Sequence, residues 1–122
     1  MSNRDRLLLL EDMHESTLKI RRYTANLDYD SFLNDDKTID AVVRNFEIIG
    51  EAANRIDPDF RKMNSEIEWN RIRGFRNRIV HDYFGIDYEI VWTIIEDDLE
   101  NLIEQIESVL LNSKTETDND SE

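Results

Sequence analysis

The octet Arg76-Asn77-Arg78-Ile79-Val80-His81-Asp82-Tyr83 has the residue types and spacing best suited to chemistry. Histidine accepts or donates a proton near neutral pH, and a fixed guanidinium stabilises the negative charge that builds on a phosphate in a transition state. Arg76 and His81 therefore suit metal-independent cleavage of an RNA phosphodiester, in which the 2′-hydroxyl loses a proton and the 5′-oxygen gains one. We expect Asn77 to orient His81 or to hold a phosphate oxygen, with Arg73 as a supporting cation.

A helical wheel through this part of the chain separates a core face from a polar face. The core face holds Ile72, Phe75, Ile79 and Tyr83, with Trp69 at its edge. The polar face holds Asn70, Arg73, Gly74, Asn77 and His81. Because the polar face contains a glycine, we expect another backbone or a ligand to approach it closely. Asn77 and His81 are four residues apart, so on a helix their side chains can meet.

Arg76 and His81 are five residues apart, which places them about 140° apart around a straight helix. Three arrangements would still unite them: the arginine wraps around the helix, the helix distorts near its end, or a second copy completes the site. Two copies packed on the stripe that contains Gly74 would bring two histidines together, one as base and one as acid. This arrangement favours a twofold homodimer.

A purely structural interpretation of the same residues stays open. Arg76 would then pair with an acid on another helix, for which Glu47 and Glu51 are candidates, and His81 would be a solvated surface residue. The other histidine, His14, has acidic neighbours but no H-E-x-x-H pattern, so we expect no metal site.

The composition restricts the classes of protein to which the 122-residue chain can belong. Hydrophobic residues make up 39% of it, enough for one compact domain with a modest core. The absence of cysteine excludes a disulfide framework and a thiolate metal site. No segment has the pattern of a membrane span or a signal peptide, so we expect a cytoplasmic protein.

The net charge of −13 argues against a general nucleic-acid-binding protein, because affinity for phosphate needs clustered Lys and Arg. The charge is unevenly distributed, however. The segment from Arg55 to His81 contains seven bases and four acids, and it is the one region where an anionic ligand would be favoured. The bases are Arg55, Arg61, Lys62, Arg71, Arg73, Arg76 and Arg78.

The spacing of apolar residues predicts four long helices. The first runs from about Arg4 to Leu27, and the second from about Asp36 to Ile56. Asp57-Pro58 ends the second helix and opens a short helical turn through Met63.

A capping box, Ser65-x-x-Glu68, predicts the start of the third helix, which would run to about Tyr83. Asp87 is the expected N-cap of the fourth helix. Short connections make the helices antiparallel neighbours, so we expect an all-α antiparallel bundle of four to five helices over residues 1–111. Residues 112–122 form an acidic tail that we expect to be disordered.

The wider sequence around the octet resembles a known family. The segment Trp69–Asp87, together with Ile48–Ala53 and the pair Val91-Trp92, is similar to the signature of the HepT-like branch of HEPN domains. The resemblance extends from about Leu7 to Leu111, and its R-N-x-x-x-H-x-Y string is far more specific than a bare R-x-x-x-x-H.

The resemblance implies a HEPN helical bundle that forms a homodimer. Arg76 and His81 would be the catalytic pair of a metal-independent endoribonuclease, with its site at a cleft between two protomers and no cofactor. It further implies a toxin of a type VII-like toxin–antitoxin module, whose partner is a minimal nucleotidyltransferase (MNT) antitoxin that adenylylates Tyr83. The substrate would be RNA, and no DNA or membrane partner is expected. The alternative is a non-catalytic dimeric module that binds the nucleotidyltransferase.

Overall fold

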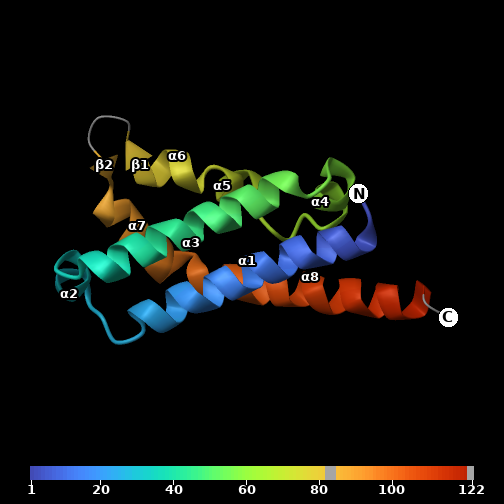
Figure 1. The fold of residues 1–122 in the computed structure, drawn as a ribbon, viewed down its shortest axis with the longest axis horizontal. Helices are drawn as coiled ribbons and strands as arrows, with labels where there is room; N and C mark the ends of the chain where they lie inside the picture. The colour runs from blue at the N-terminus through green and yellow to red at the C-terminus, as the bar shows by residue number, and fades with distance from the viewer. Residues whose placement is uncertain (82–84, 121–122) are drawn as a thin grey trace.

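The structure is a computed structural model that describes residues 1–81 and 85–120, with side chains up to residue 115. Within these residues the chain forms an all-α HEPN-type fold with one very small sheet (Figure 1). The elements are α1 (Asn3–Thr24), α2 (Tyr29–Leu33), α3 (Asp36–Arg55), α4 (Pro58–Met63), α5 (Trp69–Arg73), α6 (Phe75–Ile79), β1 (Val80–His81), β2 (Gly85–Ile86), α7 (Tyr88–Asp97) and α8 (Leu99–Asp120).

Helix α3 lies at the centre of the bundle. It packs against α1 on one side and against α5 and α6 on the other, while α8 packs against α1 (Figure 1). The apolar residues that recur every three or four positions along α3 form a buried stripe, and its members are Ile39, Val42, Phe46, Ile49, Ala53 and Ile56. On α1, two threonines, Thr17 and Thr24, are also buried.

The contact between α3 and α5 depends on Gly50. A Cβ atom at this position would lie 3.1 Å from the carbonyl oxygen of Ile72, closer than most side chains tolerate. We expected Gly74 to allow a close approach, but a Cβ atom there would meet only its own preceding turn, at 3.4 Å from the carbonyl oxygen of Asn70. The glycine that allows two backbones to meet is therefore Gly50.

The predicted third helix is wrong in its extent. It is divided at Gly74, whose φ of −90° and ψ of 1° lie outside the helical region, and it ends at Ile79. Val80 and His81 instead pair with Ile86 and Gly85 in an antiparallel ladder. Ile79 and Val80 are β-branched, and Gly85 follows five residues after Val80. Both features favour a hairpin over a continued helix, which accounts for the end of α6 at Ile79.

The ends of the other elements follow simple capping chemistry. The carboxylates of Asp28, Asp35 and Asp87 each accept a hydrogen bond from a backbone N–H of the helix they precede, so the N-cap predicted at Asp87 is confirmed. The capping box predicted at Ser65 is wrong, since α5 begins at Trp69 with no side-chain cap. Asp98 divides the predicted fourth helix into α7 and α8.

The backbone after residue 111 belongs to α8 as far as Asp120, and the disorder that we expected for residues 112–122 stays a prediction. Helix α8 continues to Asp120, with no proline or glycine to stop it. Lys114 lies 3.8 Å from a carboxylate oxygen of Glu11 on α1, which ties this extension to the bundle. The domain boundary at residue 111 stays a prediction.

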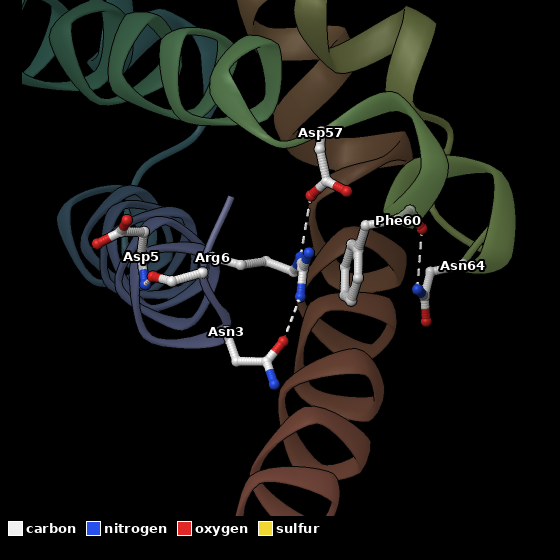
Figure 2. Close-up of polar contacts among 7 residues, drawn as sticks. Asn3, Asp5, Arg6, Asp57, Phe60 and Asn64 are labelled. Carbon is white, nitrogen blue, oxygen red and sulfur yellow. Dashed lines mark hydrogen bonds and ion pairs between the residues drawn. The ribbon is translucent and has the colours of Figure 1, made fainter.

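A polar clamp holds the start of α1 against α4 (Figure 2). Arg6 Nε donates to Asp57 Oδ1 at 3.0 Å, and Arg6 Nη1 donates to Asn3 Oδ1 at 2.8 Å. The same guanidinium lies over the Phe60 ring, 4.6 Å from its centroid. Because Asp57 is the N-cap residue of α4 and Phe60 lies within it, the clamp fixes this short helix against α1.

Candidate functional site

Arg76 lies on α6 at the edge of a groove between α3 and α5–α6. The groove has a volume of about 380 Å³ and is lined by Glu47, Gly50, Glu51, Asn54, Asn70, Arg73, Gly74 and Arg76. The Arg76 side chain is exposed and forms no ion pair with any residue in the described ranges. We considered Glu47 and Glu51 as its partners, but Glu47 pairs with Arg44 at 3.5 Å, and neither acid forms an ion pair with a groove arginine. The charge of Arg76 is therefore available to a ligand.

Arg73, the supporting cation of the sequence prediction, lines the same groove and is held by neutral amides. Its Nε and Nη2 atoms donate to Asn54 Oδ1 at 3.1 and 2.9 Å, and Nη1 donates to Asn70 Oδ1 at 3.5 Å. Amide oxygens fix the direction of the guanidinium without cancelling its charge. Arg73 and Arg76 together thus give the groove a cationic side opposite the acids of α3.

His81 lies on β1, directly opposite Gly85 in the ladder. Its Nε2 atom is 3.2 Å from Asp87 Oδ2, and the imidazole side chain is 46% exposed. In a neutral histidine, a carboxylate at Nε2 favours the tautomer that carries its proton on that nitrogen. The Nδ1 lone pair would then be available to accept a proton from a substrate hydroxyl.

Asp87 has two roles in this geometry. Its Oδ1 atom caps α7 by accepting from the Ile90 N–H at 3.1 Å, and its Oδ2 atom faces His81. The pKa of the Asp87 carboxyl is lowered from its ordinary value of 3.8, mainly by the Ile90 backbone hydrogen bond and further by His81. The group is therefore a carboxylate at any pH at which RNA cleavage would be assayed.

The structure brings only some of the predicted site residues together. Arg73 and Arg76 share the groove, whereas His81 does not line it. Asn77 is exposed on α6, and because the helix ends before His81, no hydrogen bond joins these two side chains; their predicted meeting on one helical face is wrong. Tyr83 lies outside the described residues.

Two residues of this arrangement were not predicted as part of the site. Asn54 orients Arg73 from α3, and nothing in its local sequence distinguishes it from a surface amide. Asp87 was predicted only as a helix cap. The signal that could have revealed its second role is Gly85, because a glycine between His81 and Asp87 allows a reversal that brings the two side chains together.

Two general features complete the description. In the part of the chain that the structure describes, no three His, Asp or Glu side chains are grouped as metal ligands would be. Over the same residues, no helix is both long and apolar enough to cross a bilayer.

Comparison with known proteins decides the family. The family described as Ribonuclease HepT-like matches residues 13–109, which is most of the chain. The chain belongs to the HepT-like ribonuclease family. Its relatives include a protein of Methanocaldococcus jannaschii named "Putative RNase", 38% identical over 109 residues that cover 89% of this chain and 100% of the relative.

Other relatives also have names that describe them as ribonucleases. A second protein of Methanocaldococcus jannaschii, also named "Putative RNase", is 34% identical over 98% of both chains. A protein of Thermococcus cleftensis named "Probable ribonuclease HepT" is 38% identical, with 76% of this chain and 84% of the relative covered. No solved structure gives a significant match. The matched residues of the HepT-like family include α5, α6 and the hairpin with His81.

Proposed function

We propose that this HepT-like protein is a metal-independent endoribonuclease whose active site forms where two copies of the chain meet. Two observations carry the proposal: His81 pairs with Asp87, and Arg76, on the helix that precedes His81, has no acidic partner among the described residues. A half-exposed imidazole held by a carboxylate suits proton transfer, and an unpaired guanidinium suits a phosphate. The names of the relatives support ribonuclease chemistry.

In the proposed reaction, His81 of one copy accepts the proton of a ribose 2′-hydroxyl through its Nδ1 atom. The 2′-oxygen attacks the adjacent phosphorus, and the bond from phosphorus to the 5′-oxygen breaks. His81 of the second copy donates a proton to that leaving oxygen, so the products are a 2′,3′-cyclic phosphate and a 5′-hydroxyl. Arg76 stabilises the added negative charge on the phosphate, and Asp87 holds the imidazole in the required tautomer.

The need for two copies follows from the distribution of the residues. Within one chain, Arg76 and Arg73 line the groove beside α3, whereas His81 lies on the hairpin outside it. A single histidine would also have to serve as base and then as acid. A twofold axis near α6 and the hairpin would supply a second imidazole and a second guanidinium in one step.

The test of catalysis is the incubation of purified protein with RNA in excess EDTA. We expect cyclic-phosphate ends with the wild type and their loss in Arg76→Ala and His81→Ala. The matched control is His14→Ala, because the only other histidine lies on α1 beside Glu107, and this variant should cleave like the wild type. If the wild type and His81→Ala are equally inactive on varied RNAs, the alternative stands: a non-catalytic module that binds a minimal nucleotidyltransferase.

The dimeric site has its own test. Wild-type protein is mixed with increasing His81→Ala protein under conditions that allow subunits to exchange. If both histidines of a dimer are required, the cleavage rate falls as the square of the wild-type fraction at constant total protein. A rate that falls linearly with that fraction would show that each chain acts alone.

We further propose that the protein is the toxin of a type VII-like HEPN/MNT toxin–antitoxin pair and that its antitoxin adenylylates Tyr83. An AMP group near His81 would add bulk and negative charge where the RNA phosphate should bind. Incubation with the partner nucleotidyltransferase and ATP should raise the intact mass by one or more AMP units. An unchanged mass, or an increase that persists in Tyr83→Phe, would contradict this assignment.

A further inference from the structure

A second, larger groove adjoins the proposed site. It has a volume of about 630 Å³ and is lined by Pro58, Arg61, Lys62, Ser65, Ile67, Glu68, Trp69, Asn70, Arg71 and Arg73. Asn70 and Arg73 line this groove and the Arg76 groove alike. The two grooves are therefore neighbours that meet at Arg73, and the second one extends from the proposed site toward α4.

The positive charge of the protein gathers along this path. Six of the 15 lysines and arginines form an ion pair among the residues described by the structure, and the other nine do not. Six of these nine lie between Arg55 and Arg78, and they are Arg55, Arg61, Lys62, Arg73, Arg76 and Arg78. Four of these six line the two grooves, namely Arg61, Lys62, Arg73 and Arg76, whereas Arg55 and Arg78 do not.

Within the larger groove, three basic side chains have no acidic partner among the described residues, and they are Arg61, Lys62 and Arg73. Arg71 is paired with Asp98 at 2.7 Å and with Glu68 at 3.6 Å. Glu68 is the only acid among the lining residues, and it is the partner of Arg71. Arg61 and Lys62 have no ion pair among the described residues, and Arg73 donates hydrogen bonds only to amide oxygens, so no acid in this part of the protein neutralises any of the three.

The groove is suited to a sugar–phosphate backbone more than to bases. Trp69 is only 6% exposed, and its indole N–H donates to the Asn64 carbonyl at 3.0 Å, so the ring offers no face on which a base could stack. The exposed polar residues, Ser65 and Asn70, can donate to phosphate oxygens. Recognition by such a surface depends on phosphates and tolerates many sequences.

The helix that carries Arg61 and Lys62, α4, is held in place by contacts with α1. The clamp of Arg6 on Asp57 and Phe60 holds α4 against α1 (Figure 2). Arg61 follows Phe60 directly, and its Nη1 atom is buried without a hydrogen-bond partner among the described residues. The helix is therefore positioned by the fold, while its guanidinium is not committed to an acceptor in this part of the protein.

We propose that this second groove binds the backbone of a single-stranded RNA flank, with Arg61 and Lys62 holding phosphates beyond the scissile one and Arg73 bridging to Arg76. The proposal rests on the proposed ribonuclease function, and it assigns the substrate-binding surface that this function needs. A single strand is the expected ligand because attack by a 2′-hydroxyl in line with the leaving oxygen requires a backbone that can leave the A-form helix.

The test measures RNA binding without cleavage. A fluorescein-labelled oligouridylate is titrated with His81→Ala protein that also carries Arg61→Gln and Lys62→Gln, at several salt concentrations. The matched control carries Arg22→Gln and Lys37→Gln in the same background, since both of these bases are exposed and have no ion pair in the described ranges. Lys62→Gln alone is a third protein, because this exposed side chain can be replaced without disturbing the partly buried Arg61.

The groove predicts a specific change in salt dependence. For a single strand, the slope of log affinity against log salt becomes shallower by about 0.7 for each phosphate that a cation no longer neutralises. The slope should therefore fall by about 1.4 in the double groove variant and by about 0.7 in Lys62→Gln. The control pair should keep the wild-type slope. Equal slopes for the groove and control variants, or no RNA binding by any of the proteins, would overturn the proposal.

Two further outcomes distinguish this proposal from a protein-docking surface and from the proposed ribonuclease function. If the groove variants bind RNA normally but lose affinity for the partner nucleotidyltransferase, the groove is a protein-docking surface and our assignment is wrong. Catalysis is read independently, from cyclic-phosphate ends with the His81-containing protein. Weakened binding in the groove variants together with no cleavage by the wild type would refute the ribonuclease function, while the groove would remain an RNA-binding surface.

Discussion

Replacement of Gly85 by alanine tests whether the hairpin is what presents His81. Gly85 has a φ of +76°, the only positive value in the described chain, and a Cβ atom there would meet nothing within 4 Å. The cost of Gly85→Ala is therefore backbone strain without any steric clash. Placing an L-residue in this region costs about 1–2 kcal/mol, which corresponds to a fall in Tm of about 3–10 °C for a domain of this size.

The backbone strain at residue 85 can be relieved by a local change in the hairpin that carries His81. Gly85 pairs with His81, and Asp87 follows two residues later. Opening the two-residue ladder removes the strain but separates His81 from Asp87. We therefore expect Gly85→Ala to reduce the cleavage rate several-fold at temperatures well below its Tm, where the rest of the bundle remains folded.

Thermal unfolding followed by circular dichroism, with cleavage assays on the same samples, would measure both effects. Gly85→Asn should recover most of the lost stability and rate, because asparagine tolerates the left-handed region better than alanine. Gly74→Ala is the control: its φ is −90° and its Cβ contacts would be ordinary, so it should be as stable as the wild type or more stable by about 0.4–1 kcal/mol. A Gly85→Ala protein with unchanged Tm and rate would refute the reasoning.

Three other perturbations follow from the same structure. Asp87→Asn keeps a good helix cap but removes the carboxylate from His81, so kcat should fall several-fold with little change in KM, whereas Asp35→Asn, a cap far from the site, should leave both unchanged. Asp28, Asp35 and Asp87 have lowered pKa values because of their capping hydrogen bonds. Their contribution to stability is present above pH 3.8 and is lost as the pH falls through the lowered values. The urea midpoint of unfolding should therefore be level near pH 6 and should drop near pH 3. Gly50→Ala should push α5 away from α3 and lower the Tm, because the new Cβ atom would lie 3.1 Å from the carbonyl oxygen of Ile72. A higher Tm would contradict this expectation and would show that the helix propensity of alanine outweighs that contact.

The parts of the fold that could be predicted are those whose information is local. The α3 stripe repeats every three to four residues and is buried as the period requires. The cap at Asp87 and the proline at the start of α4 act on backbone groups only a few residues away. In each case the sequence alone contains the physical cause of the structure.

The third helix could not be predicted in the same way, because two local signals conflict there. The apolar stripe of Ile72, Phe75 and Ile79 continues the helical period, and all three residues are indeed buried. The glycines at 74 and 85 act against it, one by dividing the helix and the other by reversing the chain after it. The wheel therefore placed Arg73 correctly on the surface but gave His81 a helical direction that it does not have.

The site also depends on contacts that are distant in sequence. Arg73 is oriented by Asn54, 19 residues earlier in the chain, and Arg71 is neutralised by Asp98, 27 residues later. Whether an arginine is available to a ligand is decided by such partners, and composition cannot reveal them. The segment around Arg76 was recognised as basic from the sequence, but only the structure distinguishes Arg71, which is paired, from Arg61 and Arg73, which have no acidic partner among the described residues.

This distinction explains how a protein with a net charge of −13 can present a surface for RNA. A phosphate in the groove interacts mainly with charges inside one Debye length, about 8 Å at physiological salt. In the larger groove, the bases without an acidic partner among the described residues are Arg61, Lys62 and Arg73, and the only lining acid, Glu68, is engaged with Arg71. Glu47 and Glu51 line the adjoining Arg76 groove, opposite its arginines. Acids farther away are screened by salt, so they oppose the approach of RNA more than its retention. The net charge therefore disfavours indiscriminate attraction of nucleic acid, while the local charge of the larger groove would retain a strand that has reached it.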